Sequence, residues 1–264
     1  MTRFTKAHAC GNDFLIVEGR ADAPLAVRLC ARNTGIGADG VEFAEWTGER
    51  AATIRLVNAD GSVAEISGNG TRCVAGWMAH QKGLKVGDTV QIETDAGPRE
   101  CRLVKASGSH FEFAQGMGVP VIADKVVKLH DGMEVAGVVV STGNPHFVIF
   151  VDGPEFEAHR RDWQTLGREV CFHPAFPEQT NVEFVRVIDT NSIEIRIFER
   201  GVGPTTSSGT GTCATATASI AKRGLSAHLR VQAPGGEQTV DWAGDGAEIL
   251  LTGPAELIAS GEAW

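Results

Sequence analysis

A short motif that occurs twice is the feature that most constrains the fold of this chain. Ser67-Gly68-Asn69-Gly70-Thr71 and, 141 residues later, Ser208-Gly209-Thr210-Gly211-Thr212 each open a segment that we predict to be helical. A second repeated element precedes each motif, Gly11-Asn12 in one half and Gly143-Asn144 in the other, and the asparagine lies 55 and 64 residues before the serine. Because the two elements recur in the same order at similar spacing, they predict a duplicated unit, with two similar domains and a site between them.

Most of the remaining sequence is typical of strands. Short segments rich in Val, Ile and Phe are separated by turn residues, and we predict strands over 90–94, 101–105, 110–114, 134–141, 181–188, 192–199 and 229–233. Helical periodicity is limited to residues 25–33, 71–83, 162–171 and 212–224. The predicted fold class is therefore mixed α/β, rich in strands, with a few helices.

Strand patterning pauses at glycine and proline in residues 116–121, which marks the boundary between the domains. We place an N-terminal domain at residues 1–117 and a C-terminal domain at residues 118–251. A chain of 264 residues, 42% of them hydrophobic, is long enough to form a core in each domain.

Composition excludes several classes of function. The formal net charge of −9 argues against nucleic acids and membrane surfaces as partners, since either requires a basic face. No apolar run of 18 residues and no apolar leader occur, so we expect a soluble, cytoplasmic protein. The six cysteines and eight histidines show neither CxxC nor HExxH spacing, and we expect no metal site and no disulfide framework.

The two glycine-rich turns are suited to hold an anion. Glycine lets a backbone approach a ligand closely, and the free amides at a helix start attract negative charge. Two such starts fit chemistry at the α-carbon of an amino acid, where one group removes a proton from one face and a second returns one to the opposite face. The simpler alternative is that each turn is only a polar helix start with a serine cap.

Along nearly the whole chain, the sequence resembles the diaminopimelate epimerases, a family of cofactor-independent amino-acid racemases. The blocks that carry the resemblance are HACGNDFLIV, NTGIGADG, LVNADGSVAEISGNGTRC, TGNPHFVI, FPEQTNVEFV and FERGVGPTTSSGTGTCA, in the order of that family. The resemblance implies two similar domains, each a curled sheet around a central helix, with the substrate in the cleft between them and residues 252–264 returning to the first domain. It also implies a homodimer that needs neither pyridoxal phosphate nor a metal.

The resemblance further assigns roles to individual residues. Ser67 and Ser208 would occupy the two acid/base positions, with His146 and Glu199 behind them; a structural hydrogen bond is the alternative role for either of the latter. Substrate-contacting side chains and the residues of the two helix starts would be Asn12, Asn58, Asn144, Asn181, Arg200, Gly68, Asn69, Gly209 and Thr210. The substrate implied is LL- or meso-diaminopimelate, in the synthesis of lysine and peptidoglycan precursors.

The sequence departs from the family at the two acid/base positions, where the family has cysteines. A serine hydroxyl is far less acidic than a thiol, and no histidine or lysine is adjacent to either serine in sequence. Three explanations follow: an epimerase inactivated by replacing both cysteines, a divergent racemase or dehydratase of another amino acid that uses the two hydroxyls, or a non-catalytic amino-acid-binding protein.

Overall fold

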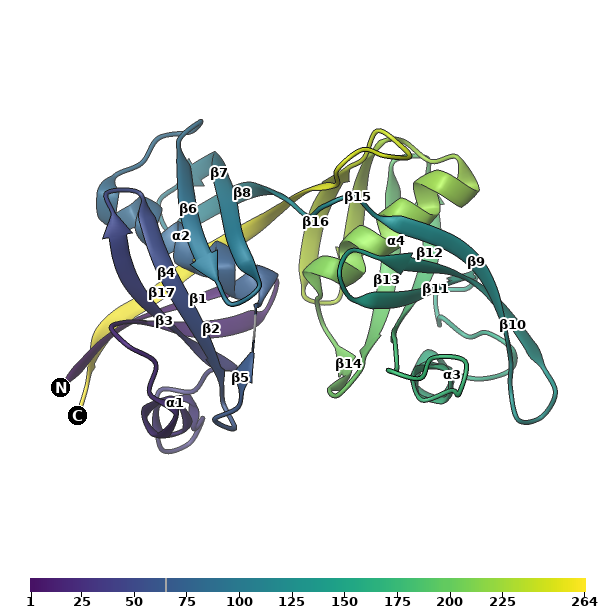
Figure 1. Cartoon of the computed structure of the whole chain (residues 1–264), viewed down its shortest axis with the longest axis horizontal. Coiled ribbons are helices and arrows are strands. Elements are labelled where there is room, and N and C mark those ends of the chain that lie inside the picture. Colours follow the sequence, from purple (N-terminus) through teal and green to yellow (C-terminus); the bar gives the residue numbers. More distant parts are fainter. Residues whose placement is uncertain (65) are drawn as a thin grey trace. The chain divides into compact units, whose positions relative to one another are not determined.

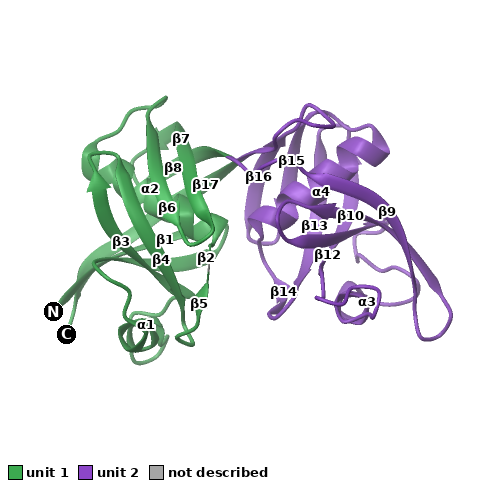
Figure 2. Ribbon diagram, viewed as in Figure 1, with its two compact units in different colours: residues 1–115, 252–264 green, residues 116–251 purple. Residues whose placement is uncertain are grey.

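The computed structural model describes residues 1–64 and 66–264. The chain divides into two compact units, one formed by residues 1–115 with 252–264 and the other by residues 116–251 (Figure 2). We describe each unit by itself.

Unit 1 is a closed sheet around one helix (Figure 1). Its helices are α1 (Ala23–Cys30) and α2 (Gly68–Lys82), and its strands are β1 (Thr2–Ala9), β2 (Asn12–Glu18), β3 (Gly40–Gly48), β4 (Ala51–Asn58), β5 (Val63–Ala64), β6 (Thr89–Thr94), β7 (Gly97–Ser107), β8 (His110–Gly116) and β17 (Leu250–Ala263). Strand pairing runs in the order β1, β2, β3, β4, β6, β7, β8 and β17, and β17 pairs again with β1. The strands thus form a closed ring, and α2 lies inside it.

This enclosure explains the composition of α2. Every residue from Asn69 to Ala79 is buried, and the apolar ones pack against inward-facing side chains of the surrounding strands. A helix that is covered on all sides has no polar face, in contrast to an amphipathic surface helix. The helix ends at Gly83, whose φ of 61° is the left-handed conformation that glycine adopts without a steric penalty.

Unit 2 repeats this arrangement around α4. Its helices are α3 (Trp163–Cys171) and α4 (Gly209–Arg223), and its strands are β9 (Val121–Lys128), β10 (Glu134–Ser141), β11 (Pro145–Val151), β12 (Asn181–Asp189), β13 (Ser192–Glu199), β14 (Gly203–Thr205), β15 (His228–Ala233) and β16 (Gly236–Asp241). Pairing runs from β9 through β10, β11, β12, β13 and β15 to β16. One face of this curled sheet packs on α4, and a second cluster lies on the side of α3.

The two units match in order and direction of pairing. β2 and β3 are parallel, as are β11 and β12, and β4 and β6 are parallel, as are β13 and β15. The registers also correspond, since Phe14 lies opposite Gly40 in unit 1 and His146 lies opposite Asn181 in unit 2. The strand-rich α/β class, with two similar units each built as a curled sheet around a central helix, is confirmed.

The predicted starts of the two central helices were wrong by three residues. α2 begins at Gly68 instead of Thr71, and α4 at Gly209 instead of Thr212. The glycines of the motif lie in the first turn, where backbone amides have no intrahelical partner and a serine cap compensates for poor helix propensity. α1 ends at Cys30, before the predicted Asn33, because the chain turns and the Gly35 amide donates to the Ala31 carbonyl (2.8 Å).

None of the helices in the described part of the chain combines the length and apolar character that a membrane crossing requires.

Candidate functional site

The start of α4 is fixed by Ser208. Its hydroxyl oxygen accepts from the Gly211 amide at 3.3 Å, and its carbonyl accepts from the Thr212 amide at 2.9 Å. The Ser208 side chain is buried. The serine therefore serves as the N-cap of α4, whose first two residues, Gly209 and Thr210, are partly exposed.

A histidine and a glutamate form a buried pair next to this helix start. His146 Nδ1 lies 2.7 Å from Glu183 Oε1, and both side chains are inaccessible to solvent. The other ring nitrogen, Nε2, lies 3.2 Å from Asn144 Oδ1, and Asn144 Nδ2 donates to Thr210 Oγ1 at 3.2 Å. Both ring nitrogens lie within hydrogen-bond distance of an oxygen atom, so the imidazole ring is held from both sides.

Glu199, at the end of β13, completes the polar cluster of unit 2. Burial raises the pKa of Glu199, and the nearby Glu183 adds to this effect, while the Ser208 hydroxyl, His146 and the Thr205 hydroxyl act in the opposite direction. Glu199, next to the Ser208 hydroxyl, therefore holds its proton more readily than an exposed carboxyl group does.

The predicted substrate-binding residues of unit 2 lie close to this cluster. Asn181 lies opposite His146 in the parallel β11 and β12 pair, and its Oδ1 accepts from the Arg200 amide at 3.0 Å. The Arg200 guanidinium donates to the Glu178 carbonyl at 3.0 Å. The residues that unit 2 brings together are Asn144, His146, Asn181, Glu199, Arg200, Ser208, Gly209 and Thr210.

Unit 1 has an equivalent helix start at Ser67. The Ser67 hydroxyl oxygen accepts from the Gly70 amide at 3.1 Å, and its carbonyl accepts from the Thr71 amide at 2.8 Å. Asn69 Nδ2 donates to Asn12 Oδ1 at 3.4 Å, and the guanidinium of the fully buried Arg72 donates to Asn69 Oδ1. The first turn of α2 is thereby connected to the turn between β1 and β2.

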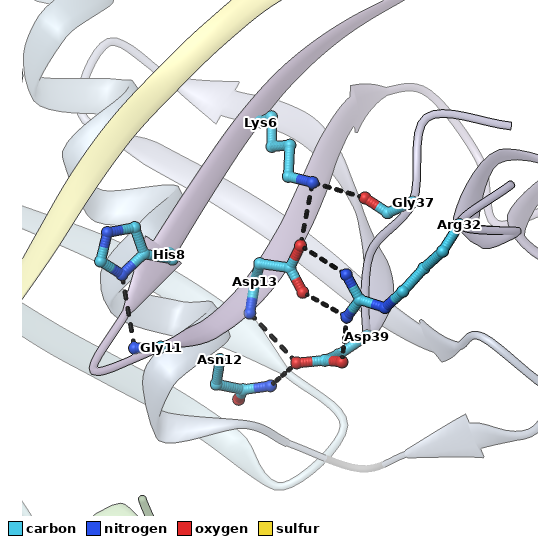
Figure 3. Close-up of polar contacts among 8 residues, drawn as sticks. All are labelled: Lys6, His8, Gly11, Asn12, Asp13, Arg32, Gly37 and Asp39. Carbon is cyan, nitrogen blue, oxygen red and sulfur yellow. Dashed lines mark hydrogen bonds and ion pairs between the residues drawn. The ribbon is translucent and has the colours of Figure 1, made fainter. Parts of the chain in front are cut away.

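Asn12 is held from its other side by a network of charges (Figure 3). Its Nδ2 donates to Asp39 Oδ2 at 2.7 Å, and Arg32 bridges Asp39 and Asp13 at 2.7 and 2.9 Å. Lys6 Nζ lies 2.9 Å from Asp13. The network fixes which way the Asn12 amide faces, because its Nδ2 points to a carboxylate and its Oδ1 to Asn69.

The Asn58 side chain forms a hydrogen bond within the turn that follows β4. Its Nδ2 donates to Ser62 Oγ at 2.9 Å, and its Cα partner is Gly40, which in turn lies opposite Phe14. Asn58 is thus separated from β2 by one strand, while Asn12, Ser67, Gly68 and Asn69 gather at the start of α2.

Sequence reasoning missed two buried glutamates, Glu42 on β3 and Glu183 on β12. Both side chains are fully buried, although each lies in the middle of an apolar strand. The available signal was a repeated tripeptide, Val41-Glu42-Phe43 and Val182-Glu183-Phe184, in the two halves of the duplication. A charged residue at an inward-facing strand position indicates a special environment, because burial of a carboxylate is costly.

The six cysteines do not take the place of the two serines at the helix starts. All six are unbridged and buried, and Cys73 and Cys213 lie within α2 and α4. Burial raises the pKa of the Cys10 thiol, an effect that Arg72 only partly opposes, and raises that of Cys73 further. Both thiols are thereby kept from the reactive thiolate form.

The sequence matches the protein-family model for diaminopimelate epimerase over residues 4–122 and 138–258. The chain belongs to the diaminopimelate epimerase family. It is 38% identical over 278 residues to the diaminopimelate epimerase of Acaryochloris marina and 37% identical over 281 residues to that of Rippkaea orientalis, covering 98% of this chain and 97% of each relative. The resemblance inferred from the sequence blocks is confirmed, and with it membership of an isomerase family.

Solved structures of proteins with different names share this fold. A phenazine biosynthesis protein of the PhzF family from Bacillus anthracis matches with a TM-score of 0.75 at 17% identity, covering 100% of this chain and 99% of that chain. A probable proline racemase from Agrobacterium radiobacter matches with a TM-score of 0.70 at 15% identity, covering 100% and 93%. At these identities the likeness shows the shared fold alone.

The charge network around Asp13 predicts an acid sensitivity in this member of the diaminopimelate epimerase family. Burial would raise the pKa of Asp13, but hydrogen bonds from Arg32 and Lys6 outweigh it and hold the pKa below its usual value of 3.8. The stabilisation is present above pH 3.8 and is lost as the pH falls through the lower folded-state pKa. Between pH 4 and pH 2, the free energy of unfolding in urea should fall faster with decreasing pH for the native chain than for Asp13→Asn. Lys6→Met, which removes one of the two partners of Asp13, should give an intermediate decrease. An equal decrease in all three proteins would contradict the assignment.

Glu42 predicts that the free energy of unfolding falls, instead of rising, as the pH increases above about 4.5. Burial raises its pKa from 4.5 to about 8, so the folded chain retains a proton that the unfolded chain has released. The free energy of unfolding should therefore fall from about pH 4.5 to about pH 8, by roughly 1.4 kcal/mol per pH unit relative to Glu42→Gln. Chemical denaturation of both proteins at several pH values measures this difference, and a difference that stays constant with pH would show that Glu42 is ionised when folded.

Proposed function

We propose that this chain has the scaffold of an epimerase acting at the α-carbon of diaminopimelate, with Ser67 and Ser208 at the two acid/base positions. The observation that carries the proposal is that each serine caps the central helix of its unit, in the same geometry and within a duplicated fold. Membership of the diaminopimelate epimerase family supports the same conclusion.

The substrate assignment rests on the polar groups around the two helix starts. Relatives at 37 to 38% identity carry the name diaminopimelate epimerase. Diaminopimelate is zwitterionic at both ends, and the amides and guanidinium of this chain suit such a ligand: Asn12, Asn58, Asn144, Asn181 and Arg200. Backbone amides at Gly68, Asn69, Gly209 and Thr210 would hold the reacting carboxylate, as helix starts hold anions. The proposed context is lysine biosynthesis, and the proposed assembly is a homodimer.

In the reaction, one group takes the α-proton and a second delivers a proton to the opposite face of the carbanion. The Ser208 hydroxyl is near enough to Glu199 to lower the pKa of that carboxyl, so Glu199, with His146 beside it, would be positioned to receive a proton from residue 208. A hydroxyl has too high a pKa to remove an α-proton efficiently, whereas a thiol at a helix start is readily ionised. We therefore propose that serine at both positions leaves the binding groups intact and removes the chemistry.

Proton NMR of LL-diaminopimelate in deuterated water tests this proposal. The α-proton signal should persist with the chain as it stands and should disappear with the Ser67→Cys, Ser208→Cys double variant, at a rate higher by roughly 10²-fold or more. The matched controls are the two single variants, which lack one of the two proton-transfer groups and should not epimerise at the rate of the double variant.

Other outcomes identify the alternative functions. Rapid exchange by the chain as it stands would show that it is a divergent racemase or dehydratase in which the hydroxyls or a carboxylate suffice. Binding of LL-diaminopimelate without exchange by any of the four proteins would indicate a non-catalytic amino-acid-binding protein. Absence of both binding and exchange would refute diaminopimelate as the ligand.

A further inference from the structure

The buried glutamates of the two units occupy equivalent positions. Glu42 lies opposite Ile16 in the parallel β2 and β3 pair, and Glu183 lies opposite Val148 in the parallel β11 and β12 pair. In each case the position is two residues beyond the first matched pair of the strands, Phe14 with Gly40 and His146 with Asn181. The two carboxyl groups therefore descend from the same place in the repeated unit.

Each carboxyl also lies against the first turn of the central helix. A Cβ added to Gly70 would lie 2.0 Å from Glu42 Oε1, and a Cβ added to Gly211 would lie 2.9 Å from Glu183 Oε1. Both glycines are the third residue of their helix, and both donate their amide to the capping serine. Packing thus explains why glycine occupies this position in both units, since a larger residue would collide with the carboxyl group.

The two units differ in the hydrogen-bond partner of the buried carboxyl group. In unit 2 the Glu183 carboxyl has a partner, because its Oε1 lies 2.7 Å from His146 Nδ1. In unit 1 the position equivalent to His146 is Phe14, which offers no charge or hydrogen bond. Neither carboxyl oxygen of Glu42 has a hydrogen-bond partner in the part of the chain that the structure describes.

An unpaired carboxylate at this depth is strongly disfavoured, so Glu42 retains its proton in the folded chain. The first turn of α2 does not offset the cost, because Ser67 itself accepts from the Gly70 and Thr71 amides. Burial is the dominant influence on Glu42 and raises its pKa to about 8.

The charged groups on the neighbouring elements are engaged elsewhere. On α2, Arg72 donates to Asn69 and to the Pro254 carbonyl, and the Cys73 thiol is kept neutral by burial. On β2, Asp13 is paired with Lys6 and Arg32. On β4, Arg55 is half-exposed and pairs with Asp95 at 2.9 Å.

We propose that Glu42 is a positioning residue for the helix start of unit 1: as a neutral acid against the first turn of α2, it leaves the positive potential of that turn available to the substrate carboxylate. A negative charge on Glu42 would cancel part of this potential and weaken anion binding. The identity of the anion rests on the proposed function, whereas the charge state of Glu42 does not.

The first test is binding of LL-diaminopimelate by isothermal titration calorimetry from pH 6 to pH 9.5. Glu42→Gln keeps the shape of the side chain without the charge, and titration of the ligand cancels in the ratio of the two affinities. The two proteins should bind equally at pH 6 to 7, and the native chain should bind about tenfold more weakly than the variant at pH 9.5. A ratio that stays constant over the whole range overturns the proposal.

Two variants control this measurement. Glu112→Gln removes a carboxylate of the same unit that pairs with Lys105 on the surface, and it should retain the pH dependence of the native chain. Glu42→Met removes the carboxyl without leaving an unsatisfied polar group, and it should behave as Glu42→Gln does. Glu42→Met is also the replacement to use if the glutamine variant fails to fold.

A second test needs no ligand. The six native cysteines are buried, so alkylation of the Ser67→Cys variant by iodoacetamide reports the thiolate at this helix start. Rates with and without Glu42→Gln should agree within about twofold at pH 7 and diverge above pH 8, where the protein that retains Glu42 becomes slower. A divergence of about tenfold already at pH 6.5, or none up to pH 10, overturns the proposal. If LL-diaminopimelate binds to none of the proteins, the proposed function fails while this measurement still decides the role of Glu42.

Discussion

The cap at the start of each buried helix is the interaction on which the rest of the structure depends. The first amides of a helix have no intrahelical partner, so they require acceptors from outside the helix. Ser67 and Ser208 supply two acceptors each, one from the hydroxyl and one from the carbonyl. The amides that remain at each start create the local positive potential, and the asparagines, histidine and carboxyl groups are arranged around it.

The duplication preserves geometry more strictly than it preserves charge. Both units keep the serine, the third-position glycine and the buried glutamate, yet His146 stands where the other unit has Phe14. The neighbours of the carboxyl therefore differ: Glu183 has the His146 imidazole as its partner, whereas Glu42 has no hydrogen-bond partner in the described part of the chain.

Sequence reasoning recovered the fold to the extent that the repeat and the strand pattern determined it. The bounds of residues 134–141 and 192–199 were predicted correctly because turn residues flank uninterrupted apolar alternation. The helix starts were misplaced because propensity disfavours glycine in helices, while a cap and tertiary enclosure override propensity. Among the site residues, those on repeated motifs were identifiable, including Asn12 and Asn144, and their clustering with the helix starts agrees with their place in the repeat.

The residues that escaped prediction are those whose role depends on what lies across a strand pair. Nothing in the local sequence shows that Asp39 accepts from the Asn12 amide, since the two residues are distant in sequence and meet only when β2 and β3 align. The role of Glu183 likewise depends on its contact with His146. The role of Glu42 depends on the absence of such a partner, because Phe14 occupies the equivalent position. Such contacts follow from register, which is set by the whole sheet.

Serine and cysteine at the two cap positions differ in how well they stabilise the helix start and in how readily they act as a base. Serine is among the best N-cap residues, and its hydroxyl accepts from an amide that would otherwise be unsatisfied, a contribution of about 1 kcal/mol per helix. A thiol is a weaker acceptor but ionises far more readily, and the helix start favours the resulting thiolate. The same position therefore cannot be optimal both as a cap and as a base. The serine-bearing chain has the arrangement that favours a stable helix start, and the polar side chains near the cap of α4 include Asn144, His146 and Glu199.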